Sequence, residues 1–248
     1  MRLTVVGCAP AWTTRRSDPS SSYLVEEGGT AIVLDLGQGA LGALAAIRPP
    51  ESIAALFISH LHPDHHADLV PLRHYLRYGL GAPASVELHG PAELRTRYDA
   101  FLGETGFLDG LPGADLRPGS LSIGDLTVEA REVTHALNSH AFRITAKSGG
   151  RGLVYSGDCG RAADLRPLIV AGDTLLCEAF WGMSEADEGA QHLTAADAAW
   201  VARDGGAARL ILTHIPDAHD PVASARSAAR SFDGEVLLAR PGLHIDIA

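Results

Sequence analysis

The segment Ser59-His60-Leu61-His62-Pro63-Asp64-His65-His66 decides how this chain is interpreted. It follows the apolar, strand-like residues 54–58, so its polar side chains are expected on a loop at the end of a strand. Imidazole nitrogens and carboxylate oxygens are ligands that Zn²⁺ accepts at about 2.0–2.2 Å. Because a loop can direct these side chains to different sides, they can bind two metal ions rather than one. The segment therefore predicts a metal centre, most simply a binuclear one.

Length and composition describe a globular protein. The chain has 248 residues, 46% of them hydrophobic and 20% charged, and we interpret residues 1–248 as one α+β domain. The formal net charge of −10 argues against a nucleic-acid partner, because DNA and structured RNA are usually bound by a basic face. A small anionic substrate remains possible, since bound metal ions supply local positive charge.

The cysteines and the N-terminus indicate where the protein works. Three scattered cysteines are too few for a disulfide framework. Residues 1–7 are expected to form a short strand, and this N-terminal segment does not contain the apolar region of a signal peptide. No apolar run reaches the roughly 18–20 residues that cross a bilayer. We therefore expect a cytoplasmic protein with no membrane partner.

Two sets of strands, each mixed with helices, are expected along the chain. Strands are predicted at 2–7, 22–26, 30–35, 53–58, 85–89, 126–133, 140–146, 151–155, 173–177, 208–212, 235–239 and 243–247. Helices are predicted at 39–47, 68–78, 91–102, 194–204 and 221–231, and a loop at 103–119. This order suggests two facing sheets covered outside by helices.

Three further candidate ligands lie after predicted strands. His135, Asp158 and His214 each follow an apolar strand within about three residues. Ends of neighbouring strands meet at one edge of a sheet, so residues distant in sequence can come together there.

The ordered motifs from His60 to His214 resemble the metallo-β-lactamase-fold hydrolases. The resemblance implies a four-layer αββα sandwich with two divalent metal ions, Zn²⁺ first, with Mn²⁺ or Fe also suited. It implies the following ligands: His60, His62 and His135 for the first ion, Asp64, His65 and His214 for the second, and Asp158 bridging both. The flavodiiron branch usually carries Glu at the position of His62, which disfavours a redox function.

A finer resemblance is to the ribonuclease Z-like phosphodiesterase branch. In that branch a histidine matching His192 assists phosphate chemistry, and a glutamate matching Glu178 orients it. The segment 135–144 also looks similar, although Asn138 stands where proline is common and Ala141 where glycine is common. The resemblance thus implies catalytic roles for Asp64, His192 and Glu178.

The substrate implied is small. The basic arm with which tRNA-processing members hold tRNA has no visible counterpart, since residues 103–119 contain only Arg117 as a basic residue. The segments Gly7-Cys8-Ala9-Pro10 and Ser20-Ser21-Ser22-Tyr23 look similar to actinobacterial-type cyclic-nucleotide phosphodiesterases. We therefore expect hydrolysis of a 3′,5′-cyclic nucleotide such as cAMP by a hydroxide shared between two metal ions.

Several alternatives stay open. They are a ribonuclease Z-like tRNA 3′ endonuclease, an acyl hydrolase (thioesterase, lactonase or lactamase) on the same fold, and a catalytically silent binding module. Ser21 and Ser22 are candidates for phosphate contact, and His140 for either substrate contact or packing. A homodimer is expected because members of the branch are often dimers.

Overall fold

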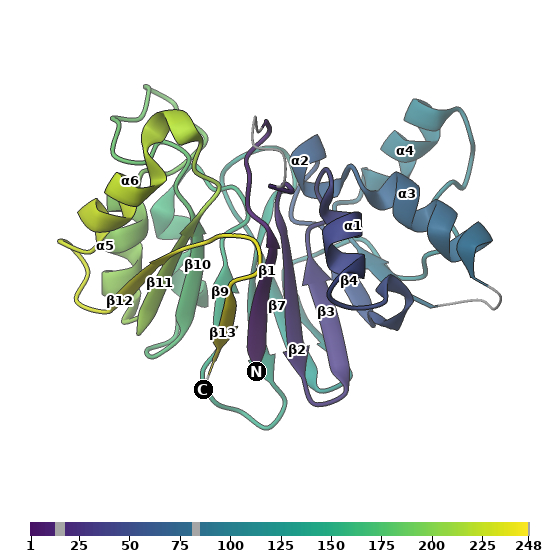
Figure 1. Cartoon of the computed structure of the whole chain (residues 1–248), viewed down its shortest axis with the longest axis horizontal. Coiled ribbons are helices and arrows are strands. Elements are labelled where there is room, and N and C mark those ends of the chain that lie inside the picture. Colours follow the sequence, from purple (N-terminus) through teal and green to yellow (C-terminus); the bar gives the residue numbers. More distant parts are fainter. Residues whose placement is uncertain (13–17, 81–84, 248) are drawn as a thin grey trace.

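The computed structural model describes residues 1–12, 18–80 and 85–247, which form two facing mixed sheets (Figure 1). Within these residues, one sheet has the strand order β13-β1-β2-β3-β4-β5 and the other β12-β11-β10-β9-β8-β7-β6. The last strand, β13, pairs with β1, so the two ends of the chain lie side by side in the first sheet (Figure 1). Among the described residues, no helix is long and apolar enough to cross a membrane.

The first sheet consists of β1 (Arg2–Gly7), β2 (Ser22–Glu27), β3 (Thr30–Leu34), β4 (Ala55–Phe57), β5 (Glu87–His89) and β13 (His244–Asp246). The second consists of β6 (Gly119–Ile123), β7 (Leu126–Glu132), β8 (His140–Ala146), β9 (Leu153–Tyr155), β10 (Thr174–Glu178), β11 (Arg209–Thr213) and β12 (Glu235–Leu238). Strands β3, β4 and β5 are parallel to one another, and so are β9, β10, β11 and β12. The carboxyl ends of β9, β10 and β11 therefore lie at one edge, as do those of β3 and β4.

Helices cover the outer face of each sheet (Figure 1). The first sheet is covered by α1 (Ala40–Ala45), α3 (Leu69–His74) and α4 (Leu94–Leu102), and the second by α5 (Ala195–Gly205) and α6 (Pro221–Ala228). A one-turn helix, α2 (Pro63–His66), stands at the edge of the sandwich. Short turns are 3₁₀ at Pro50–Ser52, Ala162–Asp164, Arg166–Leu168 and Asp217–His219, and π-helical at Tyr75–Gly79.

The buried side chains form three layers of core. Alternation along β1 shows why: Leu3 and Val5 point between the two sheets, while Val6 points to the helices outside. A third cluster lies between the second sheet and α5, where Val201 packs with Leu210. Central strands are buried on both faces, as the apolar sequence of β3 requires. The predicted four-layer αββα sandwich is confirmed, while its interpretation as a single domain 1–248 stays a prediction.

The structure differs from the sequence prediction at three elements, the first of which is the one-turn helix α2, expected as part of a loop. Strand β6 is not among the predicted strands: it forms a hairpin with β7 through the two-residue turn Gly124-Asp125, where Gly124 has φ +50°. It is an exposed edge strand, so burial imposes little hydrophobic pattern on it. The helix predicted at 68–78 is α-helical only to His74 and continues as the π-helical turn.

Candidate metal centre

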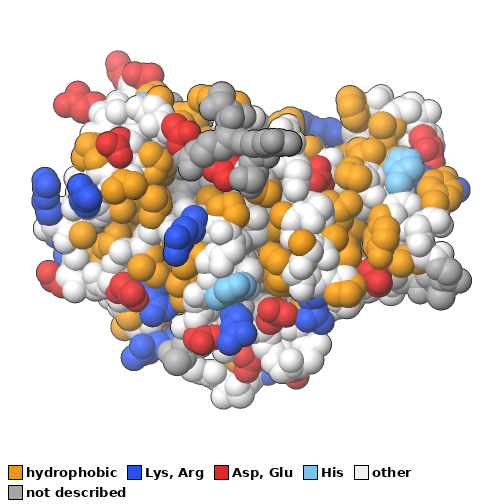
Figure 2. Space-filling model, in the orientation of Figure 1, with side chains coloured by type: hydrophobic (Ala, Val, Ile, Leu, Met, Phe, Trp, Pro, Cys, Tyr) orange, Lys and Arg blue, Asp and Glu red, His pale blue; other side chains and the backbone are white. Residues whose placement is uncertain are grey.

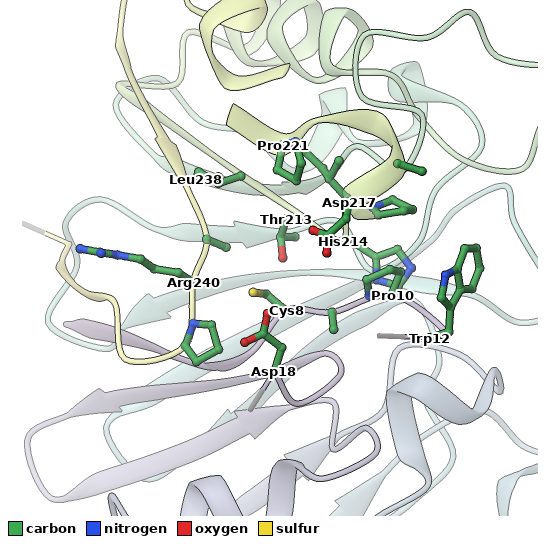
Figure 3. Close-up of a pocket in the computed structure, with 16 residues that line it drawn as sticks. Cys8, Pro10, Trp12, Asp18, Thr213, His214, Asp217, Pro221, Leu238 and Arg240 are labelled. Atoms are coloured by element: carbon green, nitrogen blue, oxygen red, sulfur yellow. The ribbon is translucent and has the colours of Figure 1, made fainter. Parts of the chain in front are cut away.

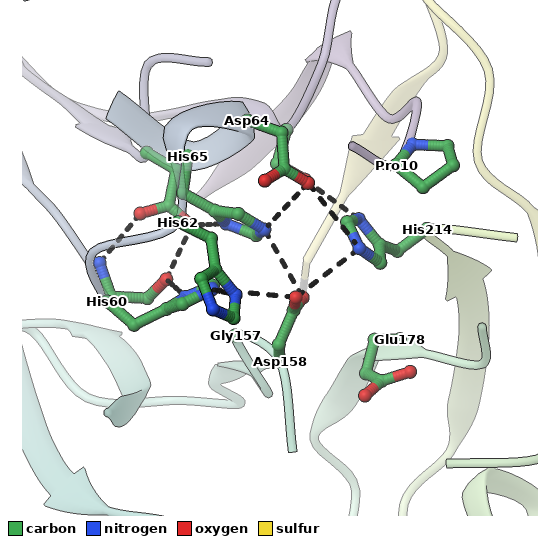
Figure 4. Close-up of polar contacts among 12 residues, drawn as sticks. Pro10, His60, His62, Asp64, His65, Gly157, Asp158, Glu178 and His214 are labelled. Atoms are coloured by element: carbon green, nitrogen blue, oxygen red, sulfur yellow. Dashed lines mark hydrogen bonds and ion pairs between the residues drawn. The ribbon is translucent and has the colours of Figure 1, made fainter. Parts of the chain in front are cut away.

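The first ligand group comes from the end of β4 and from the loop after β7. The Nδ1 atom of His62 lies 3.0 Å from Nε2 of His60 and 3.0 Å from Nε2 of His135. Nε2 of His60 lies 3.5 Å from Oδ2 of Asp158 (Figure 4). His60 is buried, whereas His62 is exposed at the surface. The structure thus brings together the residues predicted for one ion.

The second ligand group depends on α2. Pro63 occupies the first helical position, where its missing N–H costs nothing, and His62 precedes it in an extended conformation. The resulting turn carries Asp64 and His65, and the His65 ring lies against the His60 ring with centroids 4.1 Å apart. Oδ2 of Asp64 lies 3.6 Å from Nε2 of His65 and 3.7 Å from Nε2 of His214, and all three side chains are buried (Figure 4).

Asp158 lies between the two groups. Its Oδ1 is 3.3 Å from Nε2 of His65, and its Oδ2 is 3.3 Å from Nε2 of His214 and 3.7 Å from Nε2 of His135. The preceding Gly157 has φ +56°, and a Cβ there would meet the carbonyl oxygen of His140 at 2.7 Å. Only glycine fits this close approach, which explains the Ser-Gly-Asp sequence at the end of β9.

These side chains fit metal ions. Ligand atoms around a tetrahedral ion at about 2.0–2.2 Å lie roughly 3.3–3.6 Å apart, close to the separations above. The ligand atoms of each group all lie within 4.8 Å of one another. Among the residues that the structure describes, His65 Nε2 and Asp158 Oδ1 are buried without a hydrogen-bond partner, an arrangement that costs free energy unless something else binds them. The number and the identity of the ions belong to the proposal below.

Asp35 is a site residue that the sequence analysis missed. This fully buried carboxylate follows β3 and accepts hydrogen bonds from Nδ1 of His65 (2.7 Å) and the hydroxyl of Tyr155 (2.6 Å). It also accepts from the amide and hydroxyl of Ser59 (2.7 and 2.8 Å), and the Ser59 hydroxyl in turn lies 3.1 Å from Nδ1 of His60. With protons on these Nδ1 atoms, Nε2 of each ring is left free to bind metal.

Two other candidate ligands, His135 and His214, are oriented in the same manner. Nδ1 of His135 donates to the carbonyl oxygen of Gln191 at 2.6 Å, and Nδ1 of His214 lies 3.3 Å from the hydroxyl of Ser21. Ser21 and Ser22 are both fully buried, which argues against the phosphate contact expected of them. The hydroxyl of Ser21 contacts the candidate ligand His214.

Burial and neighbouring charges set the protonation of the candidate ligands. Burial alone would lower the pKa of His65, but Asp158 and Asp35 raise it well above its usual value. For two other histidines burial dominates. It lowers the pKa of His60 well below its usual value and that of His135 to about 4, so both rings are neutral at pH 7. Neutral imidazole is the form that binds metal. Burial alone would raise the pKa of Asp158, but the surrounding histidines lower it well below the usual range, so this carboxylate is ionised.

His192 and Glu178, the predicted catalytic pair, lie next to the two ligand groups. Nδ1 of His192 is 3.0 Å from Oε1 of Glu178 and 3.9 Å from Oδ2 of Asp158. Glu178 is buried at the end of β10, and its carboxylate also accepts the amides of Cys159, Phe180 and Leu193. Burial alone would lower the pKa of His192, but the hydrogen bond and charge of Glu178 raise it above its usual value.

The main chain of His140 contacts the loop that carries the first candidate ligands. Its side chain is buried, and its amide donates to the carbonyl oxygen of Ser59 at 2.9 Å. This bond joins β8 of the second sheet to the loop that carries His60. Both ring nitrogens of His140 are buried without a hydrogen-bond partner among the described residues, and His140 lines a pocket with Arg117 and Glu132. Both interpretations of the His140 side chain therefore stay predictions.

Comparison with known proteins agrees with the fold. The chain is 35% identical to the uncharacterized protein Rv1339 of Mycobacterium tuberculosis, over 95% of this chain and 88% of that protein. It is 28% identical to ribonuclease Z of Streptomyces coelicolor, over 96% and 95% of the two chains. The crystal structure of the metallo-β-lactamase-fold protein YhfI from Bacillus subtilis matches with a TM-score of 0.86 and 26% identity, covering 99% of each chain.

A family model settles the assignment. Residues 30–215 match the beta-lactamase superfamily domain, a span that contains every ligand candidate described above. The chain therefore belongs to the beta-lactamase superfamily, as a metallo-hydrolase of its ribonuclease Z-like group.

Proposed function

We propose that the protein is a binuclear metal-dependent phosphodiesterase whose substrate is a small 3′,5′-cyclic nucleotide such as cAMP. The observation that carries this proposal is the position of His192, which is fixed by Glu178 and lies beside Asp158, the residue shared by both ligand groups. An oriented histidine at a metal centre suits phosphodiester cleavage, because the leaving alkoxide needs a proton.

Each residue has a proposed role. His60, His62 and His135 would hold one ion and Asp64, His65 and His214 the other, with Asp158 shared. Zn²⁺, or Mn²⁺ or Fe in its place, would supply Lewis acidity and lower the pKa of a bound water. Asp64 would also accept a hydrogen bond from the attacking water. As the bond between phosphorus and O3′ breaks, His192 would donate a proton to O3′, and Glu178 would keep its ring in position.

The surface supports a small substrate. Residues 103–118 do not form a free arm: Phe107, Leu108 and Leu111 are buried in the core beneath α4. On the face shown in Figure 2, Lys and Arg side chains are scattered among acidic ones and form no continuous basic patch. Together with the net charge of −10, this favours a small anion over RNA.

The alternatives are a ribonuclease Z-like tRNA 3′ endonuclease, favoured by the relative of that name, and an acyl hydrolase. An acyl hydrolase would use the same metal centre but would not need His192 as a proton donor to a ribose oxygen. Cytoplasmic location and a homodimer stay predictions.

The test is hydrolysis of cAMP by purified protein reloaded with Zn²⁺ or Mn²⁺. The Asp64→Ala variant is expected to be inactive, and His192→Ala to lose about 10²–10⁴-fold in kcat. Metal content is measured on the same samples, so that a lost ion is distinguished from a lost proton donor. His192→Ala should retain its metal, because His192 is not among the proposed ligands.

Two results would contradict the proposal. Failure of the metal-loaded wild type to hydrolyse cAMP would exclude the cyclic-nucleotide substrate and direct attention to thioesters and lactones. Cleavage of precursor tRNA in preference to cAMP would establish the endonuclease instead.

A further inference from the structure

Two aromatic side chains, Phe180 and Trp12, lie beside His192, the proposed proton donor, and are called the aromatic corner below. Phe180, two residues after Glu178, stacks on the ring of His192 with centroids 4.6 Å apart and planes at 21°. Its amide also donates to the carboxylate of Glu178 at 2.9 Å. The Phe180 ring is therefore fixed relative to the centre by the same residues that fix His192.

Trp12 completes the corner. Its ring meets Phe180 edge to face, with centroids 6.0 Å apart and planes at 75°. Trp12 is nevertheless 58% exposed, and it lines a pocket of about 200 Å³ with Pro10 and His214 (Figure 3). A large apolar ring left in solvent beside a polar centre is not explained by core packing, so its free surface suits a ligand.

The chemistry of the corner indicates what kind of ligand. The flat faces of aromatic rings favour a flat partner over an aliphatic one. All nucleobases can stack on Trp and Phe, because stacking does not depend on which hydrogen-bond donors and acceptors a base carries. The pocket is smaller than the roughly 300–1,000 Å³ that encloses a drug-sized ligand, so it fits one ring system and not a whole nucleotide. A phosphate near His192 and His214 would place a base one ribose away, on the Trp12 side.

We propose that Trp12, supported by Phe180, is the surface on which the nucleobase of the substrate stacks. This inference rests on the proposed function, because the phosphate of the same substrate is placed at the metal centre. Since stacking does not read hydrogen-bonding edges, adenine and guanine nucleotides should both be accepted.

The experiment compares two substrates that differ only in the base: cAMP and the methyl riboside of 3′,5′-cyclic ribose phosphate. For Trp12→Ala, kcat/KM for cAMP is expected to fall about tenfold through KM, while that for the base-free substrate stays unchanged. Trp12→Phe should restore most of the loss. Trp200→Ala removes another partly exposed tryptophan, on α5, and should change neither value.

The outcomes separate this inference from the proposed function. Equal losses for both substrates, or no loss for either, would overturn the stacking role while leaving the phosphodiesterase intact. If neither substrate is hydrolysed, stacking is tested by tryptophan fluorescence of the metal-loaded protein. AMP should quench it more than ribose 5-phosphate does, and Trp12→Phe should abolish that difference. Unchanged quenching in the variant would overturn the proposal.

Discussion

The two ligand groups use the same chemistry in different surroundings. Asp64, His65 and His214 are all buried, and both histidines are backed by a side chain on Nδ1, Asp35 or Ser21. In the other group, His60 is buried and its Nδ1 contacts the Ser59 hydroxyl, but His62 is exposed and Nδ1 of His135 donates to a main-chain carbonyl. Ligands fixed by buried partners bind metal more rigidly than ligands at the surface. For the two ions proposed above, we expect the one at Asp64, His65 and His214 to be held more firmly than the one in the group that contains His62.

Removing the metal should have the largest effect and tests this difference directly. Chelation is expected to abolish hydrolysis and to release ions in two phases, the first from the group that contains His62. Because an ion bound only to the folded state stabilises it, the melting temperature should fall as metal is lost. Metal content, activity and melting temperature measured along one chelator titration would show this. Release of all metal in a single phase would contradict the difference between the groups.

Replacing the shared ligand should affect both groups at once. Asp158→Ala is expected to lower kcat by about 10³-fold or more, because the contribution of a metal to transition-state stabilisation is several kcal/mol and each 1.4 kcal/mol is tenfold. Metal analysis should show that both ions bind weakly. Asp204→Asn, an exposed acid on α5 paired with Arg166, is the matched control and should behave as wild type. Loss of only one ion would mean that Asp158 is not shared.

Weakening the support behind the ligands should have an intermediate effect. Asp35→Asn retains the size of the side chain but presents an N–H₂ group to His65, Ser59 and Tyr155, which are donors toward Asp35. We expect metal affinity to fall about 10–100-fold, as is typical when a partner of a metal-bound histidine is lost. Competition with a metal-binding dye measures this. The buried group should weaken most, and an effect confined to His62 and its neighbours would contradict the assignment.

The smallest effect is expected at Ser21. Ser21→Ala removes the contact with Nδ1 of His214, and a hydrogen bond of about 1 kcal/mol corresponds to about fivefold in metal affinity. Ser22→Ala is a close control, because the Ser22 hydroxyl is buried without a hydrogen-bond partner among the described residues. Its removal should leave metal affinity unchanged and stability equal or slightly higher. Equal effects of the two substitutions would show that the contact of Ser21 is irrelevant.

The sequence was sufficient for elements with a strong local pattern. Buried strands such as β3 and β8 alternate or repeat apolar residues, and α5 begins with a Thr194–Asp197 capping box. The ligand candidates were found because each has a metal-binding side chain directly after such a strand. Strand β6 was missed since its exposed face leaves no pattern, and the turn of α2 was missed because four residues carry too little periodicity.

The sequence by itself determined which residues are candidate ligands, because ligand type is a local property. The αββα sandwich followed from the family resemblance that these ligand motifs carry, since strand periodicity alone indicated only two sets of strands mixed with helices. Only the tertiary structure decided which groups support the ligands and how deeply each is buried. Asp35 meets Tyr155 across 120 positions of the chain, and Ser21 meets His214 across 193. Such contacts depend on how the two sheets pack against each other. No local pattern encodes them, and so they appear only in the folded chain.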